Sequence, residues 1–288
     1  MRILLLGADG MLGCEVRSAC ESAGWEVFAP SLAEFDLTDP MASARLASGE
    51  WGDFDWCVNC AAYTAVDQAE SEKDLCFAVN ALGVAYLSSA CATKQIRLLQ
   101  ISTDFVFDGE KDGLYTEDDA PNPLGVYGLS KWEGEKAALR HEANIVVRTA
   151  WLFGPHGKNF PKTIIAAFKA GKKLRVVNDQ FGCPTYAPDL AKVLVQIMEK
   201  GLPGGIYHAC GPEMMSWHEF AVRAVRAYLK SVGSDEDPAI EGIPSSDWPT
   251  AAKRPKMSGL ACGKLTSIIE PSPLKKSAAA NNNFAFPV

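Results

Sequence analysis

Two side chains with complementary acid–base chemistry, Tyr127 and Lys131, lie four residues apart in the stretch VYGLSKWEGEK. On a helix, this spacing places both side chains on the same face. A phenol can protonate a developing oxyanion, but its usual pKa of about 10 is poorly matched to neutral pH. A nearby ammonium group favours the phenolate and lowers that pKa. The pair therefore fits a proton donor and its tuning group, although the spacing alone also fits an ordinary solvated pair.

A hydroxyl group is expected at the same site. The apolar run RLLQIS predicts a buried strand that ends at Ser102, directly before Thr103 and Asp104. In a doubly wound sheet, ligands bind beyond the carboxyl ends of the strands. We therefore expect Thr103 to hydrogen-bond a substrate oxygen close to Tyr127 and to help polarise it.

The N-terminal segment LLLGADGMLGCEV carries a glycine loop. Gly7, Gly10 and Gly13 follow the first apolar strand and open the first helix, with the spacing G-x-x-G-x-x-G. Glycine permits a tight turn and a close approach of the backbone to a pyrophosphate, and the helix N-terminus offers unpaired N–H groups and a partial positive charge. Because this loop is the first turn of a βαβ unit, it predicts a dinucleotide-binding site.

The choice of dinucleotide depends on the end of the second strand, which usually carries an acidic residue for the adenosine ribose of NAD. Here the strand EVFA runs into Pro30, and no carboxylate appears before Glu34 and Asp36. No arginine nearby replaces the missing carboxylate. We therefore expect NADPH as the cofactor, and NADH stays possible.

Strands and helices alternate through the first half of the chain. Apolar runs predict strands at 2–6, 26–29, 55–60, 96–102 and 144–148, and longer segments predict helices at 11–23 and 73–93. The helix that carries Tyr127 lies between the last two of these strands. Continuous apolar strands alternating with helices are typical of a doubly wound parallel sheet that is covered on both faces.

After residue 148, glycine and proline become more frequent, and short strands at 174–178 and 205–210 alternate with helices. The expected fold is α/β, a Rossmann sheet with a smaller C-terminal α/β substrate-binding lobe. The dinucleotide-binding domain would comprise 1–148 with 176–212, and the substrate-binding lobe 149–175 with 213–288. Turn-forming residues dominate 231–259, and the low-complexity end SAAANNNFAFPV is assigned no element.

Composition narrows the classes of partner. The net charge is −7, from 35 acidic and 28 basic residues, and the absence of a Lys/Arg run disfavours nucleic acid. No run of apolar residues is long enough for a membrane helix, and no His, Cys, Asp or Glu grouping has metal-ligand spacing, so we expect no membrane and no catalytic metal. Nine cysteines without framework spacing indicate a reducing, cytoplasmic setting. Cys57 and Cys60 form C-x-x-C within a strand, and we expect both to be buried and inert.

Six longer sequence motifs resemble those of a known protein family. AAYTAVDQAE, STDFVFDG, VYGLSKWEGE, RTAWLFG, NDQFGCPT and GIYHACG follow the glycine loop in this order. Over about residues 1 to 265, the chain resembles the extended short-chain dehydrogenases/reductases and, among them, the dTDP-4-dehydrorhamnose reductase family. This resemblance implies an oxidoreductase of polysaccharide biosynthesis that reduces the C4 ketone of dTDP-4-dehydro-L-rhamnose to dTDP-L-rhamnose. Related 4,6-dehydratases carry an acidic pair after the Thr, whereas Phe105 follows Asp104 here, which disfavours dehydration.

The resemblance also implies roles for individual residues. Tyr127, Lys131 and Thr103 would be catalytic. The cofactor would contact Gly7, Asp9, Gly10, Met11, Leu12, Gly13, Asp36, Leu37, Ala61, Ala62, Tyr63, Asn80, Ser102, Tyr127 and Lys131. The substrate would contact Thr64, Val66, Thr103, Asp104, Trp151, Asn159, Gln180 and Arg254.

Several residues have simpler interpretations. Trp151 fits core packing as well as it fits a substrate contact. His208 lies in a strand and is expected to be a satisfied core histidine rather than an acid or base. On the Tyr127 helix, we expect Glu133, Glu135 and Lys136 to form the solvated side.

Alternative functions stay open. One is another nucleotide-sugar reductase or an epimerase of the same superfamily. Another is a non-catalytic NADP-binding regulatory subunit, like the relative that attaches to methionine adenosyltransferase. A homodimer is possible. The family usually closes with an amphipathic helix, but Pro271, Pro273 and the asparagine run oppose a helix here.

Overall fold

A six-stranded parallel sheet forms the centre of the protein. The computed structural model describes residues 1–269 and Leu274. The strands are β1 (Arg2–Leu6), β2 (Glu26–Phe28), β3 (Trp56–Asn59), β4 (Arg97–Thr103), β5 (Ile145–Thr149) and β10 (Gly205–His208). Their order is β10-β5-β4-β3-β1-β2, and every neighbouring pair is parallel. The strand order reverses between β1 and β3, where doubly wound sheets bind their ligands.

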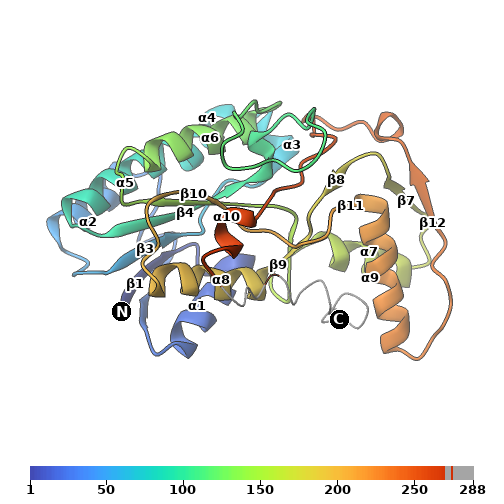
Figure 1. Cartoon of the computed structure of the whole chain (residues 1–288), viewed down its shortest axis with the longest axis horizontal. Coiled ribbons are helices and arrows are strands. Elements are labelled where there is room, and N and C mark those ends of the chain that lie inside the picture. The colour runs from blue at the N-terminus through green and yellow to red at the C-terminus, as the bar shows by residue number, and fades with distance from the viewer. Residues whose placement is uncertain (270–273, 275–288) are drawn as a thin grey trace.

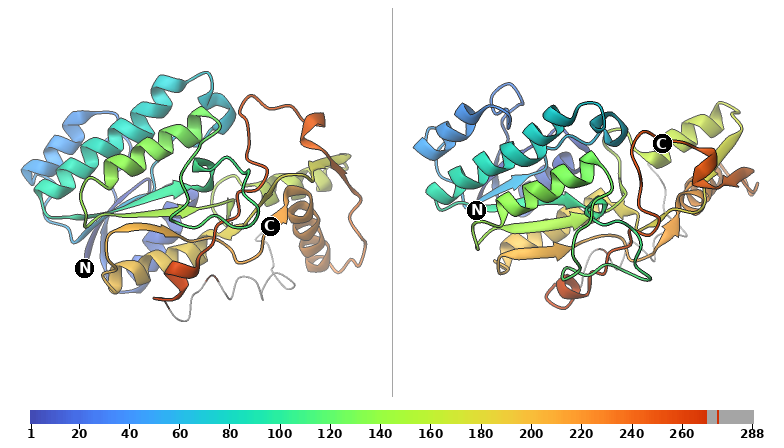
Figure 2. Two further views of the ribbon diagram at one scale, coloured as in Figure 1. Left: turned by 45° about the horizontal axis from the view of Figure 1, so that its top comes forward. Right: turned by 90° about the horizontal axis from the view of Figure 1, so that it is seen from above.

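Helices cover both faces of this sheet (Figure 1). On one face lie α1 (Met11–Ser22) and α8 (Ala187–Glu199), which pack on each other. On the other face lie α2 (Pro40–Ser48), α5 (Gly83–Thr93) and α6 (Val126–Ala138), and Figure 2 shows this arrangement from two further sides. The fold therefore confirms the predicted doubly wound α/β sheet.

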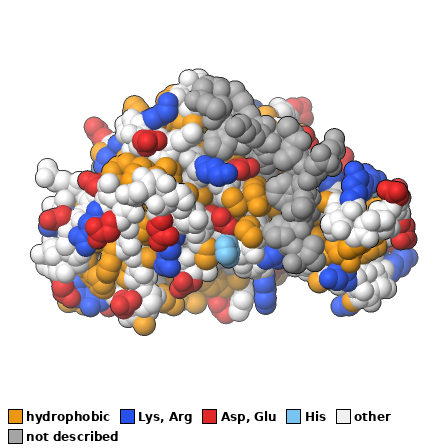
Figure 3. All heavy atoms as spheres, turned by 90° about the horizontal axis from the view of Figure 1, so that it is seen from below, with side chains coloured by type: hydrophobic (Ala, Val, Ile, Leu, Met, Phe, Trp, Pro, Cys, Tyr) orange, Lys and Arg blue, Asp and Glu red, His pale blue; other side chains and the backbone are white. Residues whose placement is uncertain are grey.

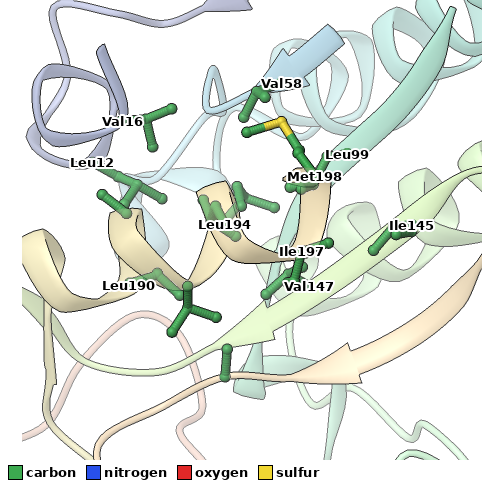
Figure 4. Close-up of a cluster of buried hydrophobic side chains, with 14 of the residues drawn as sticks. Leu12, Val16, Val58, Leu99, Ile145, Val147, Leu190, Leu194, Ile197 and Met198 are labelled. Atoms are coloured by element: carbon green, nitrogen blue, oxygen red, sulfur yellow. The ribbon is translucent and has the colours of Figure 1, made fainter. Parts of the chain in front are cut away.

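The alternation of side chains along β1 explains the two layers. Ile3 and Leu5 belong to the cluster under α1 and α8, whereas Leu4 and Leu6 belong to the cluster under α2 and α5. Because neighbouring residues of a strand point to opposite faces, a continuous apolar strand buries both faces. Figure 4 shows the first cluster, in which side chains of α1 and α8 meet those of β3, β4 and β5.

The segment predicted as one long helix is helical throughout but changes its winding. It consists of α4 (Lys73–Phe77), a π-helical turn at Ala78–Leu82, and α5. Among the described residues, Lys73–Thr93 is the one helix whose length and apolar composition would allow a membrane crossing, and half of its apolar window is buried. Its packing against α2 and α6 is that of a core helix.

A smaller lobe follows the large sheet and lies to the right in Figure 1. It contains α7 (Phe160–Lys169) and α9 (Trp217–Ser231), which pack against the parallel pair of β7 (Leu174–Val177) and β12 (Ile240–Ile243). The short elements are α3 (Val66–Ala69), β6 (Leu152–Phe153), β8 (Phe181–Gly182), β9 (Thr185–Tyr186), β11 (Met215–Ser216) and α10 (Gly263–Thr266). β12 lies inside the segment 231–259, where no strand was predicted.

The division into two domains stays a prediction. One predicted boundary, between residues 175 and 176, falls inside β7, whose four residues all pair with β12. The expectation for the C-terminal end lies outside the described residues, apart from Leu274, which is buried in the cluster under α1 and α8. On the face drawn in Figure 3, Lys and Arg side chains are interspersed with Asp and Glu.

Candidate active site

A cavity of about 370 Å³ opens at the carboxyl ends of β3, β4 and β5. Its walls include the three predicted catalytic residues, Thr103, Tyr127 and Lys131. The remaining wall comes from the glycine loop, the segment after β3, and the ends of β4 and β5: Gly10, Met11, Leu12, Gly13, Cys60, Ala61, Ala62, Thr64, Ile101, Ser102, Asp104, Thr149, Ala150, Trp151 and Leu152. The sequence-distant groups therefore meet where the prediction placed them.

Tyr127 is held at the start of α6 by close backbone packing. The helix begins after Gly125, and a side chain at Gly128 would collide with the carbonyl oxygen of Phe105. The Phe105 ring in turn meets the Tyr127 ring edge-on, with centroids 5.8 Å apart. A glycine one residue after the tyrosine thus lets α6 approach the end of β4.

The acidity of Tyr127 differs from the prediction. Burial raises the pKa of Tyr127, a hydrogen bond with the Thr103 side chain lowers it, and the charge of Asp104 raises it. The Lys131 ammonium instead donates to the carbonyl oxygen of Ile101 at 2.7 Å. The predicted net lowering of the Tyr127 pKa is therefore wrong for this structure, because burial outweighs the influences that lower it, and Tyr127 stays protonated at neutral pH.

Lys131 is itself strongly perturbed. Burial lowers the pKa of Lys131 to about 8, because the apolar surroundings disfavour the ammonium form, while the charge of Glu135 raises it. Lys131 is therefore only partly protonated above neutral pH.

Thr103 and Asp104 form a hydrogen-bonded pair. Thr103 Oγ1 donates to Asp104 Oδ1 at 3.1 Å and accepts from the Phe105 N–H at 3.2 Å. The other oxygen of Asp104 accepts from Ser258 Oγ at 2.6 Å. Burial raises the pKa of Asp104 to about 6, despite these hydrogen bonds. Ser258 comes from a distant part of the chain, and no motif in the sequence pointed to it.

Glu135 contradicts the prediction of a solvated side for α6. Its side chain is buried and forms a two-pronged ion pair with Arg148 of β5, with N–O distances of 2.9 and 2.7 Å. Ser102 also donates to it. Glu133 and Lys136 pair with each other at 2.6 Å on the exposed side, as expected. A signal for Glu135 existed, since it lies four residues beyond Lys131 and an arginine interrupts the apolar strand NIVVR.

Two further predictions concern His208 and the two cysteines of the C-x-x-C sequence. His208 is fully buried and its Nδ1 lies 3.1 Å from the Tyr115 carbonyl oxygen, which confirms a core histidine. Cys57 is fully buried, as predicted, whereas Cys60 is half-buried and lines the cavity. Burial raises the pKa of Cys60 to about 12, so its thiol stays protonated.

The glycine loop has the geometry of a phosphate-binding turn. Gly7 has φ of +73°, and a side chain there would collide with the backbone of Ala61. A side chain at Gly13 would collide with the carbonyl oxygen of Gly7. No side chain caps the N-terminus of α1, and its first turn contains no acidic residue. The first residues of α1 line the catalytic cavity, so this uncapped helix end borders the cavity, as anion binding requires.

A second cavity of about 410 Å³ adjoins the loop on its other side. Its walls contain five further predicted cofactor contacts, Gly7, Asp9, Asp36, Leu37 and Tyr63, together with Gly10, Ala61 and Ala62, which also line the catalytic cavity. The Asp36 carboxylate accepts from the N–H and hydroxyl of Thr38, each at 2.8 Å. None of the described residues that line this cavity is Arg or Lys.

Asn80 supports the site from behind. It lies in the π-helical turn, where its amide pairs with both the N–H and the carbonyl of Tyr63 and donates to Ser130 Oγ at 3.0 Å. Asn80 therefore ties the segment after β3 to α6, and it does not line either cavity.

Trp151 lines the catalytic cavity and stacks on Trp217, which lines a third cavity of about 320 Å³ in the smaller lobe. Its ring stacks on Trp217 at 3.5 Å, and its backbone has φ of +46°, which is unusual for a residue with a side chain. Trp217, Gln180 and Arg254 line the third cavity. Trp151 thus both packs against a neighbour and lines the site, so neither of its two interpretations excludes the other.

Two of the predicted substrate contacts lie elsewhere. Asn159 caps α7, with its oxygen accepting from the Lys162 N–H and its nitrogen donating to the Gly154 carbonyl. It lines neither the catalytic nor the third cavity. Val66 lines a separate small cavity beside Tyr127.

Arg254 lines the third cavity but is already paired. Its guanidinium donates to both carboxylate oxygens of Asp67 on α3, at 3.1 and 2.8 Å. Asp67 also accepts from the Ala252 N–H. This ion pair links the segment after β12 to the large domain.

The fold and the site together define a class. A Rossmann sheet whose glycine loop lies beside a Thr–Tyr–Lys group is the arrangement of the short-chain dehydrogenases/reductases. The model of one family, described as RmlD substrate binding domain, matches residues 1–281. The chain belongs to this family.

Individual relatives agree with this assignment. A dTDP-4-dehydrorhamnose reductase of Aggregatibacter actinomycetemcomitans is 40% identical, over 94% of this chain and 95% of its own length. The Bacillus subtilis spore coat polysaccharide biosynthesis protein SpsK is 34% identical, over 90% of this chain and 89% of its own. The crystal structure of Bacillus anthracis dTDP-4-dehydrorhamnose reductase in complex with NADP has a TM-score of 0.87 and 30% identity, covering 96% of this chain and 97% of that one.

Proposed function

We propose that the protein is an NADPH-dependent oxidoreductase that reduces the C4 ketone of dTDP-4-dehydro-L-rhamnose to dTDP-L-rhamnose. The convergence of Thr103, Tyr127 and Lys131 in one cavity beside the glycine loop carries this proposal. The activity named for the relatives supports the choice of substrate. Phe105, which follows Asp104, supports reduction over dehydration.

The chemistry requires one hydride and one proton. The dihydronicotinamide supplies the hydride when bound. The buried phenol of Tyr127 holds its proton at neutral pH and gives it to the C4 oxygen, which becomes the product hydroxyl. Thr103, fixed by the Phe105 N–H, orients the same oxygen. Lys131 supplies positive charge to the floor of the cavity, which stabilises the phenolate left behind.

The cofactor would lie across the switch point between β1 and β3. The free N–H groups of α1 and the loop from Gly7 to Gly13 would hold the pyrophosphate. The second cavity would hold the adenosine half. The second strand lacks the terminal carboxylate that usually selects NAD, which supports NADPH over NADH, while Asp9 and Asp36 line the cavity itself. The NADP bound to the Bacillus anthracis relative also supports this choice.

The sugar would occupy the catalytic cavity, and the nucleotide the third cavity. Thr64 and Asp104 line the first, while Gln180 and Arg254 line the second. Trp151 lines the first cavity and stacks on Trp217 of the other, so this stacked pair would contact a nucleotide-linked sugar that spans both. A cytoplasmic location and a homodimer stay predictions.

The test is an assay with purified protein, NADPH and dTDP-4-dehydro-L-rhamnose, which follows the reduced-nicotinamide absorbance and identifies the product epimer. Tyr127→Phe should lower kcat by about 10²- to 10⁴-fold, because it removes the proton donor. NADPH binding, measured by fluorescence titration, should be nearly unchanged. Tyr86→Phe, on the exposed side of α5, is the matched control and should retain full activity.

Two results would contradict the proposal. If Tyr127→Phe retained most of its activity, the proton would come from another group. If the unaltered protein bound NADPH but reduced none of several dTDP-keto sugars, a non-catalytic regulatory role would be favoured instead.

A further inference from the structure

The buried ion pair between Glu135 and Arg148 bears on the charge of Lys131 in the cavity. We infer that Glu135, held ionised by Arg148, keeps Lys131 protonated and is thereby a positioning residue for the reaction. The inference rests on the proposed function for the role of Lys131, but the charge coupling itself can be measured without turnover.

Glu135 is fixed on both of its oxygens. Arg148 Nε donates to Oε1 at 2.9 Å and Arg148 Nη2 donates to Oε2 at 2.7 Å, which is the fork geometry of strong ion pairs. Ser102 Oγ also donates to Oε1. The side chains of Glu135 and Arg148 are only 2% and 1% exposed, so water screens the pair little. The carboxylate therefore has one orientation and a full negative charge.

Lys131 lies one helical turn before Glu135 and is 4% exposed. A buried ammonium tends to lose its proton, and burial is the larger influence on the pKa of Lys131. Glu135 opposes this loss through its charge. The two residues share one face of α6, so the coupling is built into the helix that also carries Tyr127.

The other groups that face Lys131 contribute no charge at neutral pH. Its own helix contributes the Tyr127 phenol and β4 the Ile101 carbonyl. The Cys60 thiol comes from the residue after β3, and the Cys76 thiol from α4. The pKa values of Tyr127, Cys60 and Cys76 are all raised, so these three groups stay neutral. Asp104 lines the same cavity, but its charge acts on Tyr127 and is not among the influences on the Lys131 pKa. Among the described residues, the carboxylate that stabilises the ammonium is therefore Glu135.

Arg148 makes this charge possible. A buried carboxylate without a partner takes up a proton and becomes neutral. Arg148 prevents this, and its other side meets His208, whose Nε2 lies 3.4 Å from Nη1. Burial and the charge of Arg148 lower the pKa of His208 to about 3, so His208 stays neutral and Glu135 has a single cationic partner on this side.

A purely structural role is the competing explanation, since the pair also joins α6 to β5. The two explanations differ in what happens to the Lys131 pKa. We would measure this pKa in cofactor-free protein by competitive acetylation with acetic anhydride over pH 6 to 11, with mass spectrometry of the Lys131 peptide. Glu135→Gln should lower the Lys131 pKa, because the opposing charge one helical turn away is lost.

Matched variants make this test specific. Glu135→Asp keeps the charge and should return the Lys131 pKa towards that of the unaltered protein. Glu133→Gln, on the exposed side of the same helix, should leave it unchanged. If Glu135→Gln fails to fold, because Arg148 is then buried without a partner, the double variant Glu135→Gln/Arg148→Met removes both charges. It should lower the Lys131 pKa by less than Glu135→Gln, because the Arg148 cation, which opposes the ammonium, is lost as well.

Turnover provides the second readout. The alkaline limb of the pH profile of kcat/KM should move to lower pH by the same amount in Glu135→Gln, with activity regained at pH 6. A Lys131 pKa that is equal in Glu135→Gln and in the unaltered protein would overturn the inference. Absence of turnover in the unaltered protein would instead overturn the proposed function, and the acetylation result would still stand.

Discussion

Burial, more than direct contact, sets the acid–base properties of the individual site residues. The pKa values of Tyr127 and Asp104 are raised and that of Lys131 is lowered, in each case with burial as the largest cause. All three shifts favour the neutral form. For Tyr127 the neutral form is the proton donor, but the raised pKa makes it a weaker acid, so proton transfer needs a group that stabilises the phenolate. For Lys131 the neutral form is the wrong one, which explains why a second charge is placed behind it.

Asp104 allows a test of this effect through stability. Its pKa is raised from 3.8 to about 6 in the folded protein, so folding retains a proton that the unfolded chain releases. Its contribution to the free energy of unfolding is therefore complete below pH 3.8 and declines as the pH rises to about 6, by roughly 3 kcal/mol in total. Asp104→Asn removes this decline. Urea unfolding at pH 4 and pH 7.5 should show the variant gaining stability relative to the unaltered protein at the higher pH.

Asp108 supplies the control of opposite sign. Hydrogen bonds from the Glu110 N–H, Tyr115 and Asn122 lower its pKa, so its stabilising contribution is present above the unfolded pKa and is lost as the pH falls. Asp108→Asn should therefore lose stability at pH 7.5 relative to pH 4. If both variants changed in the same direction between the two pH values, desolvation of Asp104 would not explain its shift.

At the scale of elements, α6 shows what the sequence could and could not reveal. The spacing of Tyr127 and Lys131 predicted their shared face, and the strand pattern predicted the nearby hydroxyl. The same spacing rule applied once more would have placed Glu135 on that face, but a carboxylate in a polar stretch was assigned to solvent. Its partner Arg148 lies 13 residues away on another element, and helical periodicity contains no information about such pairs.

Gly134 is the second feature of α6 that the pattern did not predict, and it allows a test of the packing. A side chain there would collide with the carbonyl oxygen of Asn80 in the π-helical turn. Gly134→Ala should therefore lower the free energy of unfolding by about 1–3 kcal/mol and reduce activity, because Asn80 or α6 must shift. The measurement is urea unfolding monitored by tryptophan fluorescence.

Gly263 is the matched control for this substitution. It begins α10, has an ordinary backbone conformation, and has no atom within 4 Å of the position of an added Cβ. Gly263→Ala should change stability by less than about 1 kcal/mol, since alanine favours a helix and meets no clash. Equal losses in the two variants would show that close packing of α6 on Asn80 is not the cause.

For the whole molecule, the large sheet was predictable because local patterns define it. Its strands are continuous apolar runs, and their alternation with helices leaves few topologies. The contacts of the smaller lobe join residues far apart in sequence: Ser258 reaches Asp104 across 154 positions, and Arg254 reaches Asp67 across 187. The periodicity of apolar residues contains no information about contacts between residues so far apart in sequence. Neither β12 nor the pairing of Arg254 was therefore predicted.

The ion pair between Asp67 and Arg254 leads to a prediction about how the two parts of the molecule hold a substrate. Both side chains are partly exposed, so the pair contributes less than about 1 kcal/mol to stability. Its role would be to place the guanidinium at the third cavity. Asp67→Asn should therefore raise KM for the nucleotide sugar roughly 5- to 10-fold, a loss of about 1 kcal/mol in binding, with kcat and the KM for NADPH nearly unchanged.

The matched control for Asp67→Asn is Glu213→Gln, which breaks a similarly exposed ion pair with Arg223 inside the smaller lobe and should leave every kinetic constant unchanged. Arg254→Met should raise KM for the nucleotide sugar at least as much as Asp67→Asn, because it removes the guanidinium itself. A lower KM in Asp67→Asn would mean that the carboxylate competes with the substrate diphosphate for Arg254. The ion pair would then be a contact that opens on binding, and the positioning role argued from its geometry would be wrong.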